Sequence, residues 1–275
     1  MSSAWGKVLL ARDAKRPTAK VVIKEIFDDF IELHGDRLIG DDKSIIGGIG
    51  FFNGKPVTII AQEKGVTTDE KIYHNFGMPH PEGYHKAIRL MKQAEKFNRP
   101  VITFIDTPGA YPGIGAEERG QANAIAVAIK EMMNIKTPII SVVLGEGGSG
   151  GALAIGIANT LAMFENSIYS VISPEGFASI LYKDAKMAST AADDMRLTAQ
   201  DLLKFNIIDN IIIEKITLNI DYEPGFKNLK VFLNNELTKL AKLNKEELIK
   251  QRFSKYRNIG DYHEEIRETI ESEQI

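Results

Sequence analysis

Two apolar segments near the middle of the chain constrain its fold most strongly. Residues 100–106 (PVITFID) and 138–144 (PIISVVL) are each followed by a glycine-bearing segment and then by a helix-like run. Nearly continuous apolar strands of this length are typical of a parallel sheet that helices cover on both faces. The alternation of strands and helices therefore predicts an α/β fold.

The flanking segments extend this pattern. Residues 44–52 and 56–62 are strand-like and flank Asn53-Gly54, which is a strong signal for a β-hairpin. The first forty or so residues are charged and helix-like, with an approximate apolar stripe. Helices are also predicted over residues 81–97, 117–133, 151–159 and 174–182 and from about 226 onward, and a further strand over 167–172.

The segment Gly145-Glu-Gly-Gly-Ser-Gly-Gly151 contains five glycines in seven residues. Glycine is entropically costly, so such a cluster needs a physical reason. Backbone N–H groups at the start of a helix can bind a phosphate or stabilise an oxygen that gains negative charge in a transition state. A phosphate-binding P-loop is excluded, because no Lys-Ser/Thr pair follows the glycines. The simplest alternative is that the glycines only permit close packing of helix and strand.

Two other chemistries match the same residues. A G-x-G-x-x-G pattern starting at Gly145, with Glu165 about twenty residues later, resembles a dinucleotide-binding fingerprint, but it lies in mid-chain. A G-x-S-x-G pattern around Ser149 resembles a nucleophile elbow, which needs an acid and a histidine downstream. The only histidine after Ser149 is His263, in a charged stretch that suggests a solvated tail. Both interpretations are weaker than the one that uses backbone amides.

A second glycine-bearing segment, residues 106–115, follows the other apolar strand. Ligands of open α/β sheets bind beyond the carboxyl ends of the strands. We therefore expect the two glycine-bearing segments to line one crevice. Asp106 is interpreted as a structural cap of its turn rather than as a catalytic group.

Composition narrows the function further. A net charge of −3 and a pI near 6.0 argue against nucleic acid or an anionic membrane as the main partner. The absence of cysteine excludes disulfides, a thiol nucleophile and thiolate metal sites. No signal peptide or membrane span is recognised, so a cytoplasmic protein is expected. His74, His80 and His85 cluster in sequence without a completing carboxylate, so no metal site is predicted in this chain.

Taken together, the motifs resemble the family of carboxyltransferase α subunits of bacterial acetyl-CoA carboxylases. The resemblance extends in order over roughly residues 4–215 and is poor in the C-terminal tail. It is carried by Arg12 with Lys15-Arg-Pro17, Gly35-Asp-Arg37, Asp41-Asp-Lys43, Gly47-Gly48, Asn75-Phe-Gly-Met-Pro79, Pro81-Glu-Gly-Tyr84, Phe104-Ile-Asp-Thr-Pro-Gly-Ala-Tyr-Pro-Gly113, Gly115-Ala-Glu-Glu-Arg-Gly-Gln121, Gly145-Glu-Gly-Gly-Ser-Gly-Gly-Ala-Leu-Ala-Ile-Gly156 and Ile172-Ser-Pro-Glu-Gly176 with Ala178-Ser-Ile180.

This resemblance implies a crotonase-like fold: a β-β-α spiral with stacked sheets and peripheral N- and C-terminal helices. It implies transfer of a carboxyl group from carboxybiotin, held on the biotin carboxyl carrier protein, to acetyl-CoA. The product is malonyl-CoA, the first committed intermediate of fatty acid biosynthesis. The implied partners are a zinc-bearing β subunit in an α2β2 assembly, without which the chain is inactive, and biotin carboxylase, the component of the full complex that uses ATP.

The resemblance also assigns site residues and segments. An oxyanion hole for the ureido oxygen of biotin is expected from the backbone amides of Gly147, Gly148, Gly150 and Gly151, with no side chain acting as base. The wall of the cofactor pocket is expected from Gly109, Ala110, Tyr111 and Ala152. Residues 1–43 are predicted to be an N-terminal helical extension, 44–225 the carboxyltransferase core and 226–275 a C-terminal helical tail.

Overall fold

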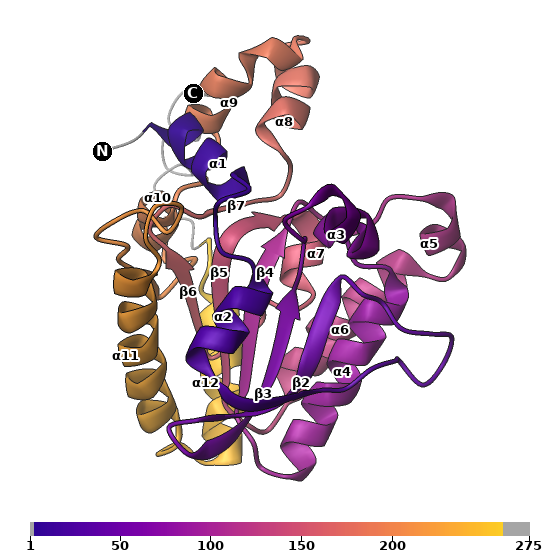
Figure 1. The fold of residues 1–275 in the computed structure, drawn as a ribbon, viewed down its shortest axis with the longest axis vertical. Helices are drawn as coiled ribbons and strands as arrows, with labels where there is room; N and C mark the ends of the chain where they lie inside the picture. Colours follow the sequence, from indigo (N-terminus) through magenta and orange to yellow (C-terminus); the bar gives the residue numbers. More distant parts are fainter. Residues whose placement is uncertain (1–2, 261–275) are drawn as a thin grey trace, which may run out of the picture.

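The computed structural model describes residues 3–260, which form one eight-stranded sheet with helices on both faces (Figure 1). The strand order is β1-β2-β3-β4-β5-β6-β8, and β7 pairs with β5 outside this path. The strands span Asp28–Glu32 (β1), Ile45–Phe52 (β2), Lys55–Gln62 (β3), Val101–Thr107 (β4), Ile139–Gly148 (β5), Thr160–Phe164 (β6), Ile168–Ser170 (β7) and Asn210–Ile212 (β8).

The sheet is mixed. β1, β2 and β3 are antiparallel, whereas every pair from β3 to β8 is parallel. The predicted hairpin is confirmed, since Phe52 pairs with Lys55 across Asn53-Gly54. β5 pairs with β6 along its first half and with β7 along its glycine end. The α/β prediction is therefore confirmed, and the described strands form one connected sheet that divides at β5.

The described residues contain more helices than the sequence pattern predicts. They span Ala4–Arg12 (α1), Ala19–Ile26 (α2), Thr68–Tyr73 (α3), Pro81–Lys96 (α4), Ile114–Glu118 (α5), Gln121–Asn134 (α6), Ser149–Leu153 (α7), Pro174–Leu181 (α8), Ala188–Asp194 (α9), Ala199–Lys204 (α10), Glu223–Leu240 (α11) and Lys245–Arg257 (α12), with short 3-10 turns at Asn75–Gly77 (η1) and Ala185–Met187 (η2). Within residues 3–260 no helix is both long and apolar enough to cross a membrane.

Three predicted helices differ from the structure. The helix predicted over 117–133 divides into α5 and α6, because Gly120 adopts a φ of +82° between them. The helix predicted over 151–159 is limited to α7, and Asn159 then leads the chain into β6 while its Oδ1 accepts a hydrogen bond from the Ile139 N–H at 3.1 Å. The helix-like N-terminal segment contains β1, which pairs with β2 at the edge of the sheet.

The central strands are buried on both faces, as their apolar sequence predicts. Ile102 and Phe104 of β4 belong to a hydrophobic cluster that α2, α11 and α12 cover. Val101 and Ile105 of the same strand belong to a second cluster, which α4, α6, α7 and α10 cover. This alternation follows the two-residue period of a strand.

Packing crosses both of the predicted segment boundaries. Val22 and Ile26 of α2 lie in the same cluster as Phe104, although they precede residue 44. α11 begins before residue 226 and contributes Leu229 and Leu233 to that cluster. The division into 1–43, 44–225 and 226–275 stays a prediction, since the described residues of all three segments share one core.

A buried ion pair attaches the segment between α1 and α2 to the segment that follows β8. The side chains of Arg16 and Glu214 are 0% and 1% exposed and approach to 2.8 Å. Arg16 also donates from Nε to the Leu144 carbonyl oxygen at 2.8 Å. Glu214 accepts from the backbone N–H groups of Asn166 and Leu218, each at 3.0 Å. Burial opposes ionisation of Glu214, but the charge of Arg16 and these hydrogen bonds outweigh it and lower the pKa of the carboxyl group.

We expect Glu214→Gln to lower the free energy of unfolding by about 3–5 kcal/mol at neutral pH, because Arg16 then lies buried without a counter-charge. Since folding lowers the pKa of Glu214, its contribution is complete above the unfolded-state pKa of about 4.3 and is lost as the pH falls through the folded-state value. Urea unfolding from about pH 7 to about pH 3 should show the difference between the two proteins shrinking.

The matched control is Glu25→Gln, at an exposed position on α2, which should change stability by less than about 0.5 kcal/mol. A difference between wild type and Glu214→Gln that is the same at every pH would contradict the account of the ion pair.

Candidate active site

The two glycine-bearing segments lie side by side where β4 and β5 end. These strands are parallel neighbours, and Thr107 pairs with Gly147. The glycine motif is not a free loop, because residues 145–148 are the last residues of β5 and α7 begins at Ser149. The two segments are therefore neighbours at the carboxyl ends of the strands, and the expectation that they line one crevice stays a prediction.

Two of the glycines are required because the segments meet through their main chains. A side chain on Gly148 would collide with the carbonyl group of Pro108. A Cβ on Gly151 would lie 2.7 Å from the backbone nitrogen of Ala110. No rotamer change relieves either collision, since the opposing atoms belong to the backbone. Gly150 has more room, because a Cβ there would meet only Ile125, at 3.5 Å. Close packing therefore explains part of the motif, and Gly150 is free to serve another purpose.

Ser149 occupies the turn from β5 into α7 with a φ of +53°. A positive φ at this point resembles the strained turn of a nucleophile elbow. The hydrogen bonds of histidine rings within residues 3–260 join His74 to Lys20 and Lys43, and His34 to Asp41. None of them reaches Ser149. His263 lies outside the described residues.

Asp106 supports the glycine motif from inside the protein. Its side chain is 1% exposed and pairs with Lys64 Nζ at 2.9 Å. Its Oδ1 accepts from the backbone N–H of Glu146 at 3.0 Å. Gln62 bridges the two segments, since it accepts from the Asp106 N–H at 3.1 Å and donates to the Gly151 carbonyl oxygen at 2.8 Å. Asp106 thus has a structural role, but it does not cap its own turn as predicted, because its carboxylate bonds Lys64 and Glu146 while Thr107 Oγ1 accepts from the Gly109 N–H at 3.0 Å.

Arg12, at the end of α1, joins the motif to α8. Its guanidinium lies 2.7 Å from Glu146 and 2.7 Å from Glu175. Burial disfavours the charge of Arg12, but these two hydrogen-bonded carboxylates outweigh it and raise the pKa of the guanidinium. Three segments far apart in sequence are therefore held together by one side chain.

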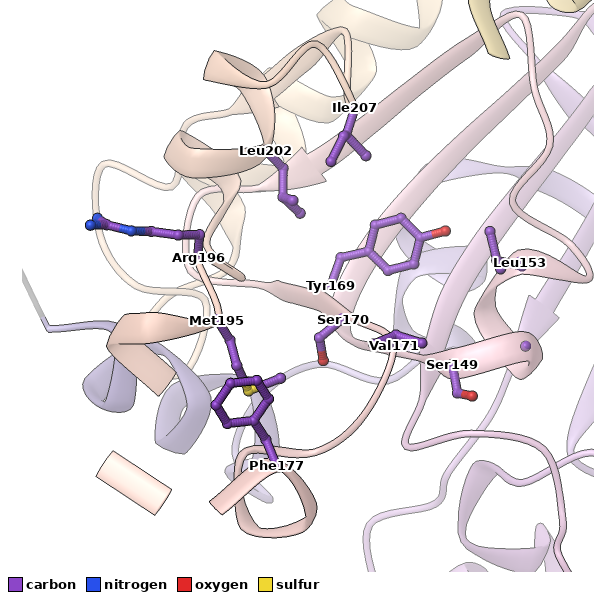
Figure 2. A pocket seen from close by; sticks show the side chains of 11 residues that line it. Ser149, Leu153, Tyr169, Ser170, Val171, Phe177, Met195, Arg196, Leu202 and Ile207 are labelled. Atoms are coloured by element: carbon purple, nitrogen blue, oxygen red, sulfur yellow. The ribbon is translucent and has the colours of Figure 1, made fainter. Parts of the chain in front are cut away.

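An apolar cavity of about 390 Å³ lies beside the start of α7 (Figure 2). Its walls come from α7, β7, α8, α10 and the segments that follow β7, α9 and α10. In Figure 2 the side chain of Arg196 points away from the other lining residues. A concave, mostly apolar site with a few polar groups is typical of small-molecule binding. The lining residues are Ser149, Gly150, Leu153, Tyr169, Ser170, Val171, Phe177, Met195, Arg196, Leu202 and Ile207.

Of the four residues predicted to shape the pocket wall, Gly109, Ala110 and Ala152 lie next to the glycine motif. Gly109 and Ala110 contact Gly151 through their main chains. Ala152 is fully buried, and the ring of Tyr111 packs against His80 with centroids 4.5 Å apart. None of the four lines the cavity in Figure 2, to which the motif contributes Ser149 and Gly150.

The wall of the cavity that faces α7 is not predictable from the sequence motifs. Tyr169 reaches it because β7 pairs with the glycine end of β5, so that Tyr169 lies opposite Gly147. Phe177 and Met195 come from α8 and from the end of α9. The strand over 167–172 was predicted, but nothing in its sequence reveals its partner.

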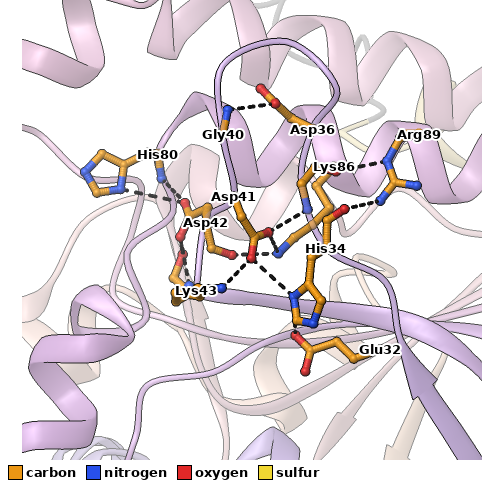
Figure 3. A network of polar contacts seen from close by, with 12 residues as sticks. Glu32, His34, Asp36, Gly40, Asp41, Asp42, Lys43, His80, Lys86 and Arg89 are labelled. Carbon is orange, nitrogen blue, oxygen red and sulfur yellow. Dashed lines mark hydrogen bonds and ion pairs between the residues drawn. The ribbon is translucent and has the colours of Figure 1, made fainter.

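A polar network surrounds Asp41 and Asp42 and includes His80, one of the three clustered histidines (Figure 3). Buried Lys86 donates to Asp41 Oδ1 at 2.6 Å and to the Asp42 carbonyl oxygen at 2.7 Å. His80 lies 3.7 Å from the Asp42 carboxylate. Over residues 3–260 no group of three or more histidine, aspartate or glutamate side chains could hold a metal ion. The network consists of ion pairs and hydrogen bonds that fix the segment before β2.

Comparison with solved structures supports the fold. A chain of the transcarboxylase 12S hexamer, solved with methylmalonyl-coenzyme A and methylmalonic acid bound, superposes with a TM-score of 0.69 at 20% identity, over 86% of this chain and 44% of that one. The Pseudomonas malonate decarboxylase MdcD-MdcE heterodimer gives a TM-score of 0.62 at 15% identity, over 83% of this chain and 90% of that one. The crotonase-like fold is thereby confirmed.

Sequence relatives identify the family. A family model described as acetyl co-enzyme A carboxylase carboxyltransferase-like matches residues 2–260. The acetyl-coenzyme A carboxylase carboxyl transferase subunit alpha of Clostridium perfringens is 57% identical over 259 residues, which is 94% of this chain and 96% of that protein. The protein of the same name from Staphylococcus carnosus is 54% identical over 262 residues, 95% of this chain and 83% of that protein. Because the match covers nearly the whole chain, the chain belongs to the family of acetyl-CoA carboxylase carboxyltransferase α subunits.

Proposed function

We propose that this chain is the α subunit of an acetyl-CoA carboxylase carboxyltransferase. It transfers a carboxyl group from carboxybiotin to acetyl-CoA and forms malonyl-CoA for fatty acid biosynthesis. The observation that carries the proposal is the family match over residues 2–260, which includes both glycine-bearing segments. Those segments meet at the ends of two parallel strands, beside an apolar cavity that suits a compact ring.

Backbone amides of the glycine motif would stabilise the charge that develops in this reaction. Carboxybiotin supplies CO₂ and, as CO₂ leaves, a negatively charged ureido oxygen that can take a proton from the acetyl methyl group. Among the four predicted donors, Gly147 and Gly148 lie in β5, where Gly147 pairs with Thr107 on one side and Tyr169 on the other. Gly150 and Gly151 lie in the first turn of α7, where N–H groups have no intrahelical acceptor and no side chain caps them.

These contacts favour Gly150 and Gly151 as the donors to the ureido oxygen. Each donor of this kind is typically worth about 10²- to 10³-fold in rate. Gln62 holds the Gly151 carbonyl oxygen at 2.8 Å and so fixes the peptide plane that follows Gly151. In this proposed mechanism the ureido oxygen takes the proton, so no side-chain base is needed.

The function requires partners that this chain does not supply. We propose an α2β2 assembly with a zinc-bearing β subunit that holds the acetyl-CoA thioester. The carboxyl group would arrive on the biotin carboxyl carrier protein, after ATP-dependent loading by biotin carboxylase. Val171 and Leu153, which border the cavity, are 79% and 40% exposed, and this apolar rim supports coverage by a partner. A cytoplasmic location remains a prediction from the sequence.

We expect Gly151→Ala to reduce carboxyl transfer at least about 10²-fold, because its Cβ would displace the backbone at Ala110 and misalign the amides of α7. The measurement is malonyl-CoA decarboxylation in the presence of biotin, with the β subunit added. The matched control is Gly40→Ala, where an added Cβ meets nothing within 4 Å, and it should keep wild-type activity. Retained activity in Gly151→Ala would contradict the role of this contact.

We expect Ser149→Ala to keep activity within about threefold, because an amide-based mechanism uses the backbone and not this hydroxyl group. A serine hydrolase would instead lose several orders of magnitude on the same change. Labelling with a fluorophosphonate probe provides an independent measurement, and the wild-type chain should remain unlabelled. Loss of activity together with labelling at Ser149 would favour the hydrolase alternative.

A further inference from the structure

The ring of Tyr169 lies against the glycine motif on the cavity side. Tyr169 is opposite Gly147 in the pairing of β5 with β7. A Cβ on Gly147 would lie 2.7 Å from Cδ2 of the ring, so the ring occupies the place of the missing side chain. The absence of a side chain at Gly147 therefore allows the ring of Tyr169 to pack there, in addition to any role of the Gly147 amide.

The hydroxyl group of Tyr169 has no hydrogen-bond partner among residues 3–260. Burial raises the pKa of Tyr169, and no hydrogen bond contributes to that shift, so the group is a neutral phenol at physiological pH. Figure 2 shows the ring extending toward Leu153 on the opposite side of the cavity. Tyr169 is partly exposed and lines the cavity, so its hydroxyl group is accessible to a bound molecule. A molecule bound in the cavity would supply the missing partner.

The wall of the cavity has few other polar side chains, and these interact with protein groups outside the cavity. Ser170 Oγ donates to the Ile172 carbonyl oxygen at 2.8 Å. Arg196 points away from the cavity and lies 4.0 Å from Asp201. The hydroxyl groups of Tyr169 and Ser149 are thus the polar side-chain groups that the described wall offers to a ligand. Such a wall fits a compact apolar ring with one neutral polar edge, and it lacks the cations that coenzyme A phosphates require.

We propose that Tyr169 binds the cyclic urea of biotin through its hydroxyl group and thereby sets the affinity of the site for the carboxyl donor. This proposal rests on the proposed function and names a binding residue for it. A cyclic urea has a carbonyl oxygen and ring N–H groups, so a phenol can donate to the first or accept from the second. The thioether ring and alkyl chain of biotin would then lie against side chains such as Leu153 and Leu202.

The test is Tyr169→Phe in the assembled α and β subunits, assayed by malonyl-CoA decarboxylation with free biotin. Phenylalanine keeps the ring on Gly147 and removes only the hydroxyl group. We expect KM for biotin to rise about tenfold, as the loss of one hydrogen bond to a ligand predicts, while KM for malonyl-CoA stays unchanged. Desthiobiotin has the same cyclic urea without the thioether ring, so its KM should rise by the same factor.

Tyr222→Phe removes a hydroxyl group far from the cavity, on the segment before α11, and should leave both KM values unchanged. An unchanged KM for biotin in Tyr169→Phe would overturn the proposal. So would a rise for biotin but not for desthiobiotin, or a rise for both biotin and malonyl-CoA with a lowered melting temperature. If the wild-type assembly transfers no carboxyl group at all, the proposed function fails, and the role of Tyr169 fails with it.

Discussion

The contact between the main chains that leave β4 and β5 is the constraint on which the site depends. Gly148 meets the carbonyl group of Pro108, and Gly151 meets Ala110, with no side chain between them. Because the two backbones touch, the chain must turn sharply at Ser149, which takes a φ of +53° and begins α7. This turn brings Ser149 and Gly150 to the cavity. A side chain at Gly148 or Gly151 would push the ends of β4 and β5 apart and would displace the backbone amides of α7.

Charged side chains behind the glycine motif stabilise this contact between the two main chains. Asp106 pairs with Lys64 and also accepts the Glu146 amide, while Arg12 holds the Glu146 carboxylate. Taking charged groups out of water is costly, and the Glu146 N–H and the Glu175 carboxylate add hydrogen bonds that offset part of this cost for Asp106 and Arg12. Their contacts are with other protein groups, so we interpret them as positioning the motif. The N-terminal segment, which supplies Arg12, is in this sense part of the site.

The cavity combines the glycine motif with segments that are distant in sequence. Tyr169 arrives through the pairing of β7 with β5, and Phe177 through α8, which Arg12 attaches to the motif through Glu175. An apolar enclosure strengthens the hydrogen bonds of backbone amides, because the local dielectric is low. The proposed chemistry needs this enclosure. The acetyl carbanion must react with the released CO₂ before water can protonate it.

The sequence by itself determined the α/β class, the hairpin at Asn53-Gly54, the buried strands β4 and β5 and the two glycine-bearing segments. Each of these features follows from a local hydrophobic period or from local turn residues. Its motifs also determined the family. The tertiary structure alone decided that β1 is a strand, that α7 ends at Leu153 and that Tyr169 faces the cavity. These features depend on which strand pairs with which and on contacts between distant segments, and a periodicity along the chain carries no information about either.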